Sequence, residues 1–133
     1  MEEYTNDTLD HFMNPRNMGE IADADGVGEV GNMRCGDVMK VFIKVETEKR
    51  SGRETEVIKD VKFQTLGCAA AIASSSMATE MVKGKTVDEA LALSKDDVNK
   101  ALGILPKQKY HCSILSADAI HKAVENYRDK DKS

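Results

Sequence analysis

The chain has 133 residues, of which 41% are hydrophobic and 32% are charged, a composition typical of one soluble globular domain. The net charge of -4 disfavours general nucleic-acid binding. No apolar run approaches the ~18 residues of a membrane span, and the acidic start MEEYTNDTLD is unlike a signal peptide. Three cysteines make an odd count, so we expect reduced thiols and a cytoplasmic protein, not a disulfide framework.

The N-terminal part is predicted to hold one helix and a long loop. Residues 5–13 form a short helix that Asn14-Pro15 ends, and its apolar side is made by Leu9, Phe12 and Met13. His11 lies in this helix and is predicted to be an ordinary polar side chain at the surface. Residues 14–29 are predicted to be loop, because Asn, Asp and Gly are frequent there.

Three strands follow in the prediction, the first of them short, at 30–34. Residues 38–46 alternate between apolar and polar side chains, and residues 57–66 alternate again with Lys59 as the polar exception. The charged residues 47–56 between them are predicted to be a solvated hairpin loop with no functional role. The two longer strands therefore pair antiparallel through this loop.

The second half of the chain is predicted to be mainly helical. Capping boxes at Thr86 with Glu89 and at Ser94 with Asp97 each begin a short helix. The polar tail 129–133 is predicted to be disordered, and no second domain is expected beyond the single domain of residues 1–133. The predicted helices cover residues 69–83, 87–93, 95–102 and 112–128.

Each cysteine falls where a predicted element begins or ends. Cys35 precedes a Gly turn with Asp37 two residues on, Cys68 lies where a strand runs into a helix, and Cys112 follows His111 at the start of the last helix. At a helix N-terminus, unpaired N–H groups and the helix dipole favour the thiolate, the form that binds metal or attacks sulfur. The residues alone therefore favour a metal or cluster site, with a sulfur nucleophile as the alternative.

Several short motifs run in order along almost the whole chain, roughly residues 4–128. They are Asp10-His11 with Asn14-Pro15-Arg16-Asn17 and Gly19, Cys35-Gly36-Asp37, Thr65-Leu66-Gly67-Cys68, Ala71-Ile72-Ala73-Ser74-Ser75-Ser76, Val82-Lys83-Gly84-Lys85 and His111-Cys112-Ser113-Ile114-Leu115. Together they resemble the U-type iron–sulfur cluster scaffold proteins, the IscU family, which is also found as the N-terminal domain of NifU.

The resemblance implies an α/β (α+β) fold: a small three-stranded antiparallel sheet with helices packed on one face. It implies a scaffold and sulfur acceptor, not an enzyme. Such scaffolds take sulfur from a pyridoxal-phosphate cysteine desulfurase of the IscS or NifS type and iron from a donor. They build a [2Fe–2S] cluster, within one chain or bridging a homodimer, and pass it to apo-proteins.

By matching position, the resemblance also implies the site residues. The ligands are Cys35, Cys68 and Cys112, with Asp37 or His111 as a fourth or exchanging ligand. Cys112 matches the position that receives persulfide sulfur, and Asp37 is predicted to control cluster release. Permanent clusters normally have four thiolates, so a weaker fourth ligand suits a protein that must release its product. Three thiolates and a carboxylate would also bind Zn²⁺ tetrahedrally.

Two alternatives are weighed against this reading. A zinc-dependent sulfurtransferase of the SufU type would accept persulfide sulfur, but that branch typically lacks a His directly before its third Cys, where this chain has His111. A purely structural zinc fold would unfold without metal. In addition, related bacterial scaffolds carry Leu-Pro-Pro-Val-Lys where this chain has Leu105-Pro106-Lys107-Gln108-Lys109, which argues against recognition by a dedicated Hsp70-type chaperone.

Overall fold

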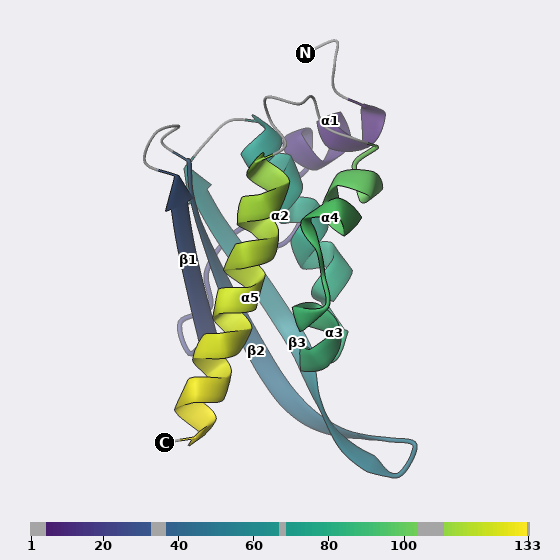
Figure 1. Cartoon of the computed structure of the whole chain (residues 1–133), viewed down its shortest axis with the longest axis vertical. Coiled ribbons are helices and arrows are strands. Elements are labelled where there is room, and N and C mark those ends of the chain that lie inside the picture. The colour runs from purple at the N-terminus through teal and green to yellow at the C-terminus, as the bar shows by residue number, and fades with distance from the viewer. Residues whose placement is uncertain (1–4, 33–36, 67–68, 104–110, 133) are drawn as a thin grey trace.

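The structure is a computed structural model that describes residues 5–32, 37–66, 69–103 and 111–132 (Figure 1). Within these ranges the chain forms three strands and five helices. In chain order they are α1 (Asn6–Met13), β1 (Gly26–Asn32), β2 (Asp37–Arg50), β3 (Arg53–Leu66), α2 (Ala69–Val82), α3 (Val87–Leu91), α4 (Lys95–Ala101) and α5 (His111–Lys132).

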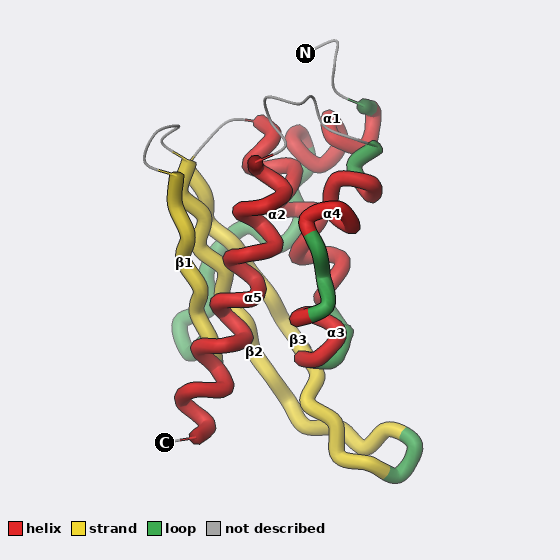
Figure 2. The backbone as a smooth tube through the Cα atoms, viewed as in Figure 1, coloured by secondary structure: helices red, strands yellow, loops and turns green. Residues whose placement is uncertain are grey.

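The three strands form one antiparallel sheet in the order β1-β2-β3, and α2 and α5 pack on one of its faces (Figure 2). α1 packs against α2, while α3 and α4 pack against α5. The core lies between the sheet and these helices, and its largest fully buried side chains include Phe63, Met39, Ile43, Ile58, Leu102 and Ile120. The predicted fold class is therefore confirmed.

Strand β1 begins at Gly26, inside the segment predicted to be loop. Its glycines hid it from the sequence pattern, because Gly lowers strand propensity. The structure shows why glycine stands there: a Cβ on Gly28 would lie 2.3 Å from the carbonyl oxygen of Ala119, and one on Gly26 would lie 2.2 Å from that of Ala123. Helix α5 can therefore lie directly against the β1 backbone only because these side chains are absent.

The predicted charged loop at 47–56 is mostly strand. β2 runs to Arg50 and β3 starts at Arg53, so the turn consists of Ser51 and Gly52 alone, both with positive φ (52° and 79°). Two such residues suit the type I′ turn that joins twisted strands. Of the charges that suggested a solvated loop, Lys49 and Glu54 lie opposite each other as an unlike pair, whereas Arg50 lies opposite Arg53.

The polar exception in the third predicted strand, Lys59, marks a β-bulge. Lys44 pairs with Asp60 and Val45 with Ile58, which leaves Lys59 without a partner in the register. A bulge changes which face the following side chains point to. Both Ile58 and Val61 are therefore fully buried although they lie three residues apart.

The apolar side predicted for the first helix is wrong in part. Met13 is 74% exposed, and the buried residues of α1 are Thr8 and His11. Thr8 Oγ1 donates to the Leu102 carbonyl at 3.1 Å, so α1 docks through hydrogen bonds and not through its apolar residues alone. The prediction placed only apolar residues on the buried face of α1, whereas polar side chains that form hydrogen bonds can be buried as well.

The predicted helices of the second half are confirmed with small changes at their ends. Capping boxes at Thr86 with Glu89 and at Ser94 with Asp97 begin α3 and α4. Helix α5 continues to Lys132, so residues 129–132 are helical and the prediction of disorder is wrong for them, while Ser133 lies outside the described residues. In the described part of the chain, no helix is long and apolar enough to cross a membrane.

Candidate functional site

The described residues that flank Cys35 and Cys68 meet at one end of the sheet. Asn32 at the end of β1 pairs with Asp37 at the start of β2, and Val38 pairs with Leu66 at the end of β3. Helix α2 then begins at Ala69. Antiparallel pairing therefore brings the segments on either side of both cysteines to the same edge, at the top of Figure 1.

The start of α5 lies at this same end. Gly26 faces Ala123 and Tyr127, whereas Gly28, further along β1, faces Ala119. Moving along β1 toward its end thus means moving back along α5 toward its beginning. His111 and Cys112, the first two residues of α5, are consequently carried to the end of the molecule where β1 and β3 end and α2 begins (Figure 1).

The five predicted site residues stand as follows. Cys112 lies in the first turn of α5, fully buried in the core cluster. Asp37 and His111 are the first residues of β2 and α5; their side chains, and all of Cys35 and Cys68, lie outside the described residues. Among the described side chains, no three His, Cys, Asp or Glu residues gather to hold a metal ion. The structure thus brings the described residues that flank Cys35 and Cys68 to the same end as Cys112, and the ligand set stays a prediction.

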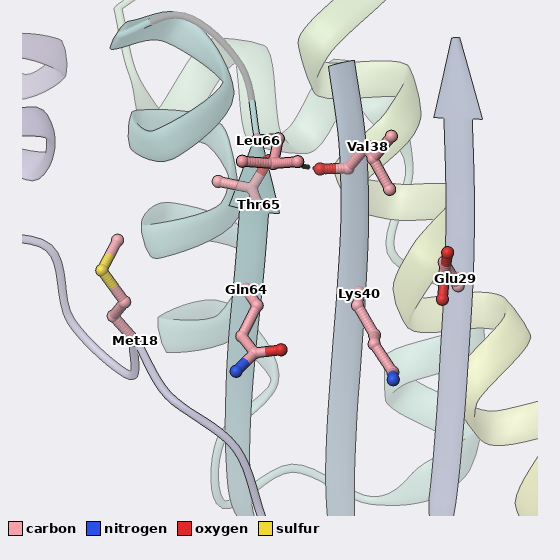
Figure 3. Close-up of a pocket in the computed structure, with 7 residues that line it drawn as sticks. All are labelled: Met18, Glu29, Val38, Lys40, Gln64, Thr65 and Leu66. Atoms are coloured by element: carbon pink, nitrogen blue, oxygen red, sulfur yellow. Dashed lines mark hydrogen bonds between the residues drawn. The ribbon is translucent and has the colours of Figure 1, made fainter. Parts of the chain in front are cut away.

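A pocket of about 460 Å³ opens beside this end of the sheet, on the face away from the helices (Figure 3). Its rim includes Val38, the neighbour of Asp37, and Leu66, which is 73% exposed two residues before Cys68. Thr65 Oγ1 donates to the Val38 carbonyl at 2.7 Å and ties the two strands together here. The full lining is Met18, Glu29, Val38, Lys40, Gln64, Thr65 and Leu66.

His11 has a role that the sequence interpretation missed. Its Nδ1 lies 2.7 Å from Ser76 Oγ on α2, and the Arg16 backbone N–H donates to the same hydroxyl at 2.9 Å. Burial, and after it the nearby Arg16 charge, holds the pKa of His11 below its ordinary value. We therefore assign a neutral ring whose Nδ1 accepts the Ser76 proton, so that the contact fastens α1 to α2.

The Asn14-Pro15-Arg16-Asn17 segment completes this attachment. The Arg16 guanidinium donates to Asp10 Oδ2 at 2.7 Å, which lowers the pKa of Asp10. Asn17 takes a positive φ of 65° and donates from Nδ2 to Thr79 Oγ1 at 3.1 Å. The motif that suggested only a turn therefore links α1 to α2. The one feature of the sequence that could have indicated this attachment is the short distance along the chain between His11 and the motif.

Comparison with known proteins agrees with the motif reading. Residues 3–133 match the family described as the NifU-like N terminal domain. The chain belongs to this family. The resemblance stated from the motifs is thereby confirmed.

Relatives of this chain include proteins named for iron–sulfur cluster assembly and one named for nitrogen fixation. The chain is 58% identical over 124 residues to iron-sulfur cluster assembly scaffold protein IscU 1 of Archaeoglobus fulgidus, covering 93% of this chain and 76% of the relative. It is 50% identical over 125 residues to the protein named as an IscU scaffold in Aquifex aeolicus, covering 94% and 76%. It is 44% identical over 131 residues to the nitrogen fixation protein NifU of Azotobacter chroococcum mcd 1, and this match covers 98% of this chain and 40% of NifU.

Solved structures show the same fold at lower identity. The crystal structure of a nitrogen-fixing NifU-like protein (N-terminal) from Brucella abortus matches with a TM-score of 0.73 at 22% identity, covering 97% of this chain and 96% of that one. The crystal structure of a protein from Fervidobacterium islandicum AW-1, named as a putative iron–sulfur cluster assembly scaffold protein for the SUF system, matches with a TM-score of 0.71 at 21% identity, covering 92% of this chain and 97% of that one. At these identities the likeness establishes the fold alone.

Proposed function

We propose that this chain is an iron–sulfur cluster assembly scaffold of the IscU type, which builds a [2Fe–2S] cluster and transfers it to apo-proteins. One observation supports the proposal: the described residues that flank Cys35 and Cys68 lie at the same end of the fold as the first turn of α5, which holds Cys112. Relatives at 50% and 58% identity are named as scaffold proteins of this kind. A reducing compartment such as the cytoplasm would suit the thiols.

The proposed ligands are the thiolates of Cys35, Cys68 and Cys112, with Asp37 or His111 as the fourth or exchanging group. Thiolates are the usual ligands of iron–sulfur clusters. A carboxylate is a harder donor than a thiolate, and its bond to iron exchanges more readily. A site of this composition holds a cluster long enough to complete it and still lets an acceptor protein take it. The cluster is therefore cargo and not a resident cofactor.

Sulfur is proposed to arrive as a persulfide from a cysteine desulfurase. The Cys112 thiolate attacks the outer sulfur of the donor persulfide, a new S–S bond forms at Cys112, and the donor leaves as a thiolate. No external oxidant is needed, because the sulfur is transferred at its existing oxidation level. Since Cys112 is fully buried, this step requires the first turn of α5 to open when the donor binds.

Partner proteins are proposed to approach from the side of the pocket. Leu66 and Met18 are 73% and 48% exposed at its margin, and exposed apolar side chains that adjoin a site are common features of interaction surfaces. The backbone N–H of Gly19 donates to the Phe63 carbonyl at 2.8 Å, which holds Met18 beside β3. The surface is therefore formed before any partner binds.

Anaerobic reconstitution with iron and sulfide tests the proposal. The wild-type chain should become reddish-brown, with a visible spectrum of a [2Fe–2S] cluster, and native mass should tell a cluster within one chain from one that bridges two. A zinc-dependent sulfurtransferase, the alternative, would stay colourless and would instead gain persulfide from a desulfurase with zinc bound. A colourless wild-type sample that retains iron at no fixed stoichiometry would overturn the scaffold assignment.

A further inference from the structure

Ser113, the third residue of α5, is fully buried, and its hydroxyl has no hydrogen-bond partner in the described structure. A buried hydroxyl without a partner is destabilising, because its water contacts are lost and not replaced. Such groups are few in native proteins, and each needs a physical explanation. The position of Ser113, next to Cys112 at the start of the helix, suggests one.

The helix itself cannot satisfy this hydroxyl. Buried serines in helices usually donate to a carbonyl three or four residues earlier, as Ser75 does to Ala71 at 2.9 Å and Ser116 does to Ser113 at 3.0 Å. The residues three and four before Ser113 precede the start of α5. Helical side chains also lean toward the N-terminus of their helix. The Ser113 hydroxyl therefore leans toward the end of the molecule that holds the candidate site.

Ser74 on α2 is a second buried hydroxyl with no partner in the described structure. Its case differs, because the Ala70 carbonyl four residues earlier lies within the same helix and becomes available by rotation of one side-chain torsion. Its lack of a partner therefore does not require a ligand. Ser113 has no such acceptor in its own helix.

We propose that the Ser113 hydroxyl is a hydrogen-bond donor to anionic sulfur held at the candidate site, either the persulfide of Cys112 or a sulfide of the bound cluster. This inference rests on the proposed function. Hydrogen bonds to cluster sulfurs stabilise the added negative charge and raise the reduction potential. Ser113 is then a binding residue whose unmet hydrogen bond in the empty protein is met when sulfur arrives.

The test compares Ser113→Ala with Ser116→Ala, a matched control one turn later on the same helix whose hydroxyl is buried but bonded. In the cluster-free protein, Ser113→Ala should raise the melting temperature by about 3 °C, because it removes an unsatisfied group. Ser116→Ala should lower it slightly. After reconstitution, Ser113→Ala should shorten the cluster lifetime about threefold, the effect of one hydrogen bond, and lower its reduction potential, whereas Ser116→Ala should match wild type in both.

The two sulfur sources are separated by a second arm. Incubation with desulfurase and cysteine but without iron loads persulfide alone, and its lifetime on Cys112 is followed by mass spectrometry. A shorter persulfide lifetime in Ser113→Ala assigns the bond to the persulfide, while an effect confined to the iron-loaded protein assigns it to the cluster.

Three results would overturn the inference. The first is a Ser113→Ala protein with wild-type lifetimes and potential. The second is an equal change in Ser116→Ala, which would make the effect one of packing. The third is a loss of folding in Ser113→Ala, which would show that the Ser113 hydroxyl stabilises the fold and is not held unpaired for sulfur. If the wild-type chain assembles no cluster, the proposed function fails, while the iron-free persulfide arm still tests Ser113. A wild-type chain that gains neither cluster nor persulfide would overturn both.

Discussion

The two ends of the sheet are built on different principles. At the hairpin end, Ser51 and Gly52 make a tight turn and Glu48 pairs with both Lys59 and Arg50. At the opposite end, Ser113 is buried without a partner in the described structure and Leu66 is left 73% exposed. The hairpin end follows the rules that stabilise a fold, whereas the other end breaks several of them.

Departures from these rules are expected where a protein binds something. An unsatisfied hydroxyl, an exposed leucine and a buried thiol all lie within two residues of a predicted ligand or are one themselves. No comparable group is found among the described residues of the β2–β3 turn. The contrast therefore supports the proposed site at this end of the molecule, and the following experiments test it.

The largest effect is expected from the cysteines. Cys35→Ser and Cys68→Ser should remain folded and lose stable cluster assembly, because each removes one of the three thiolate ligands. Cys112 needs alanine instead, since a serine would place a hydroxyl in the fully buried core and lose about 2 kcal/mol of stability. Reconstitution followed by visible spectroscopy measures the result, and wild-type assembly by any one variant would remove that residue from the ligand set.

Next in size is the effect of a side chain beneath α5. Gly28→Ala should destabilise the protein by about 3 kcal/mol, because its Cβ would lie 2.3 Å from the Ala119 carbonyl oxygen and the helix would have to shift. Gly52→Ala in the hairpin turn is the matched control, because a Cβ there meets no atom within 4 Å. This variant should lose only about 1 kcal/mol of stability, the cost of placing alanine at a positive φ. Urea unfolding of both variants measures the difference, and equal losses would contradict the close approach of α5 to β1.

Asp37 should affect the cluster more than the fold. If its carboxylate is the exchanging ligand, Asp37→Ala should keep the cluster longer in air and transfer it more slowly to an apo-ferredoxin, with little change in melting temperature. If Asp37 only caps its turn, the variant should lose about 1 kcal/mol of stability with an unchanged cluster lifetime. Cluster decay and melting measured on the same two samples decide between the two, and an unchanged decay rate would end the assignment of Asp37 to the site.

The attachment of α1 should depend on pH. Burial holds the pKa of His11 below its ordinary value, so the unfolded chain binds a proton at a higher pH than the folded one does. Stability from the neutral ring is therefore complete above pH 6.5 and falls as the pH drops below it. Wild-type protein should melt at a lower temperature at pH 5.5 than at pH 7.5, and the difference should shrink in His11→Gln, whose amide can still contact Ser76.

The charges around His11 act in both directions, so the lowered pKa of the ring is due first to burial. Arg16 opposes protonation of the ring, while Asp10, Glu80 and Asp7 favour it. The pKa of Asp10 is itself lowered by Arg16, so this carboxylate stays ionised between pH 5.5 and 7.5 and does not contribute to the change. An equal loss of melting temperature in wild type and His11→Gln would assign the pH dependence to another group.

Much of the fold was predictable because local signals agreed with the tertiary structure. The alternation of β2 from Met39 to Ile43 and the capping boxes of α3 and α4 were both confirmed. The first strand was predicted, but its start was placed at residue 30 and not at Gly26, because its glycines are set by contact with α5, which no local pattern reports. The antiparallel hairpin was predicted correctly, but its strands were made too short, because a run of charged residues is typical of a solvated loop and their pairing with a second strand is not visible in the local sequence.

The sequence proposes residue types for the candidate site, and these stay a prediction, but it gives no view of the surroundings of the site. Cysteines beside Gly, Asp and His at element boundaries indicate ligands by themselves. The contact of His11 with Ser76 links residues 65 positions apart, and the missing partner of Ser113 depends on where α5 begins. Both are consequences of packing, so they become visible only in three dimensions.

The smallest effect is expected at the hairpin end. Glu48 contacts Lys59 and Arg50, and its hydrogen bond from Lys59 lowers the pKa of Glu48. These side chains are 30%, 41% and 45% exposed, so water and salt screen their attraction. Glu48→Gln should therefore change the melting temperature by less than about 2 °C. The change should shrink further in 0.5 M salt, where the screening length is roughly half of its value at 0.1 M. Cluster lifetime after reconstitution should equal that of wild type, because the substitution lies at the end of the sheet opposite the cysteine segments. A faster or slower cluster decay in Glu48→Gln would show that the two ends are coupled, and the division of the molecule into a stabilising end and a functional end would be wrong.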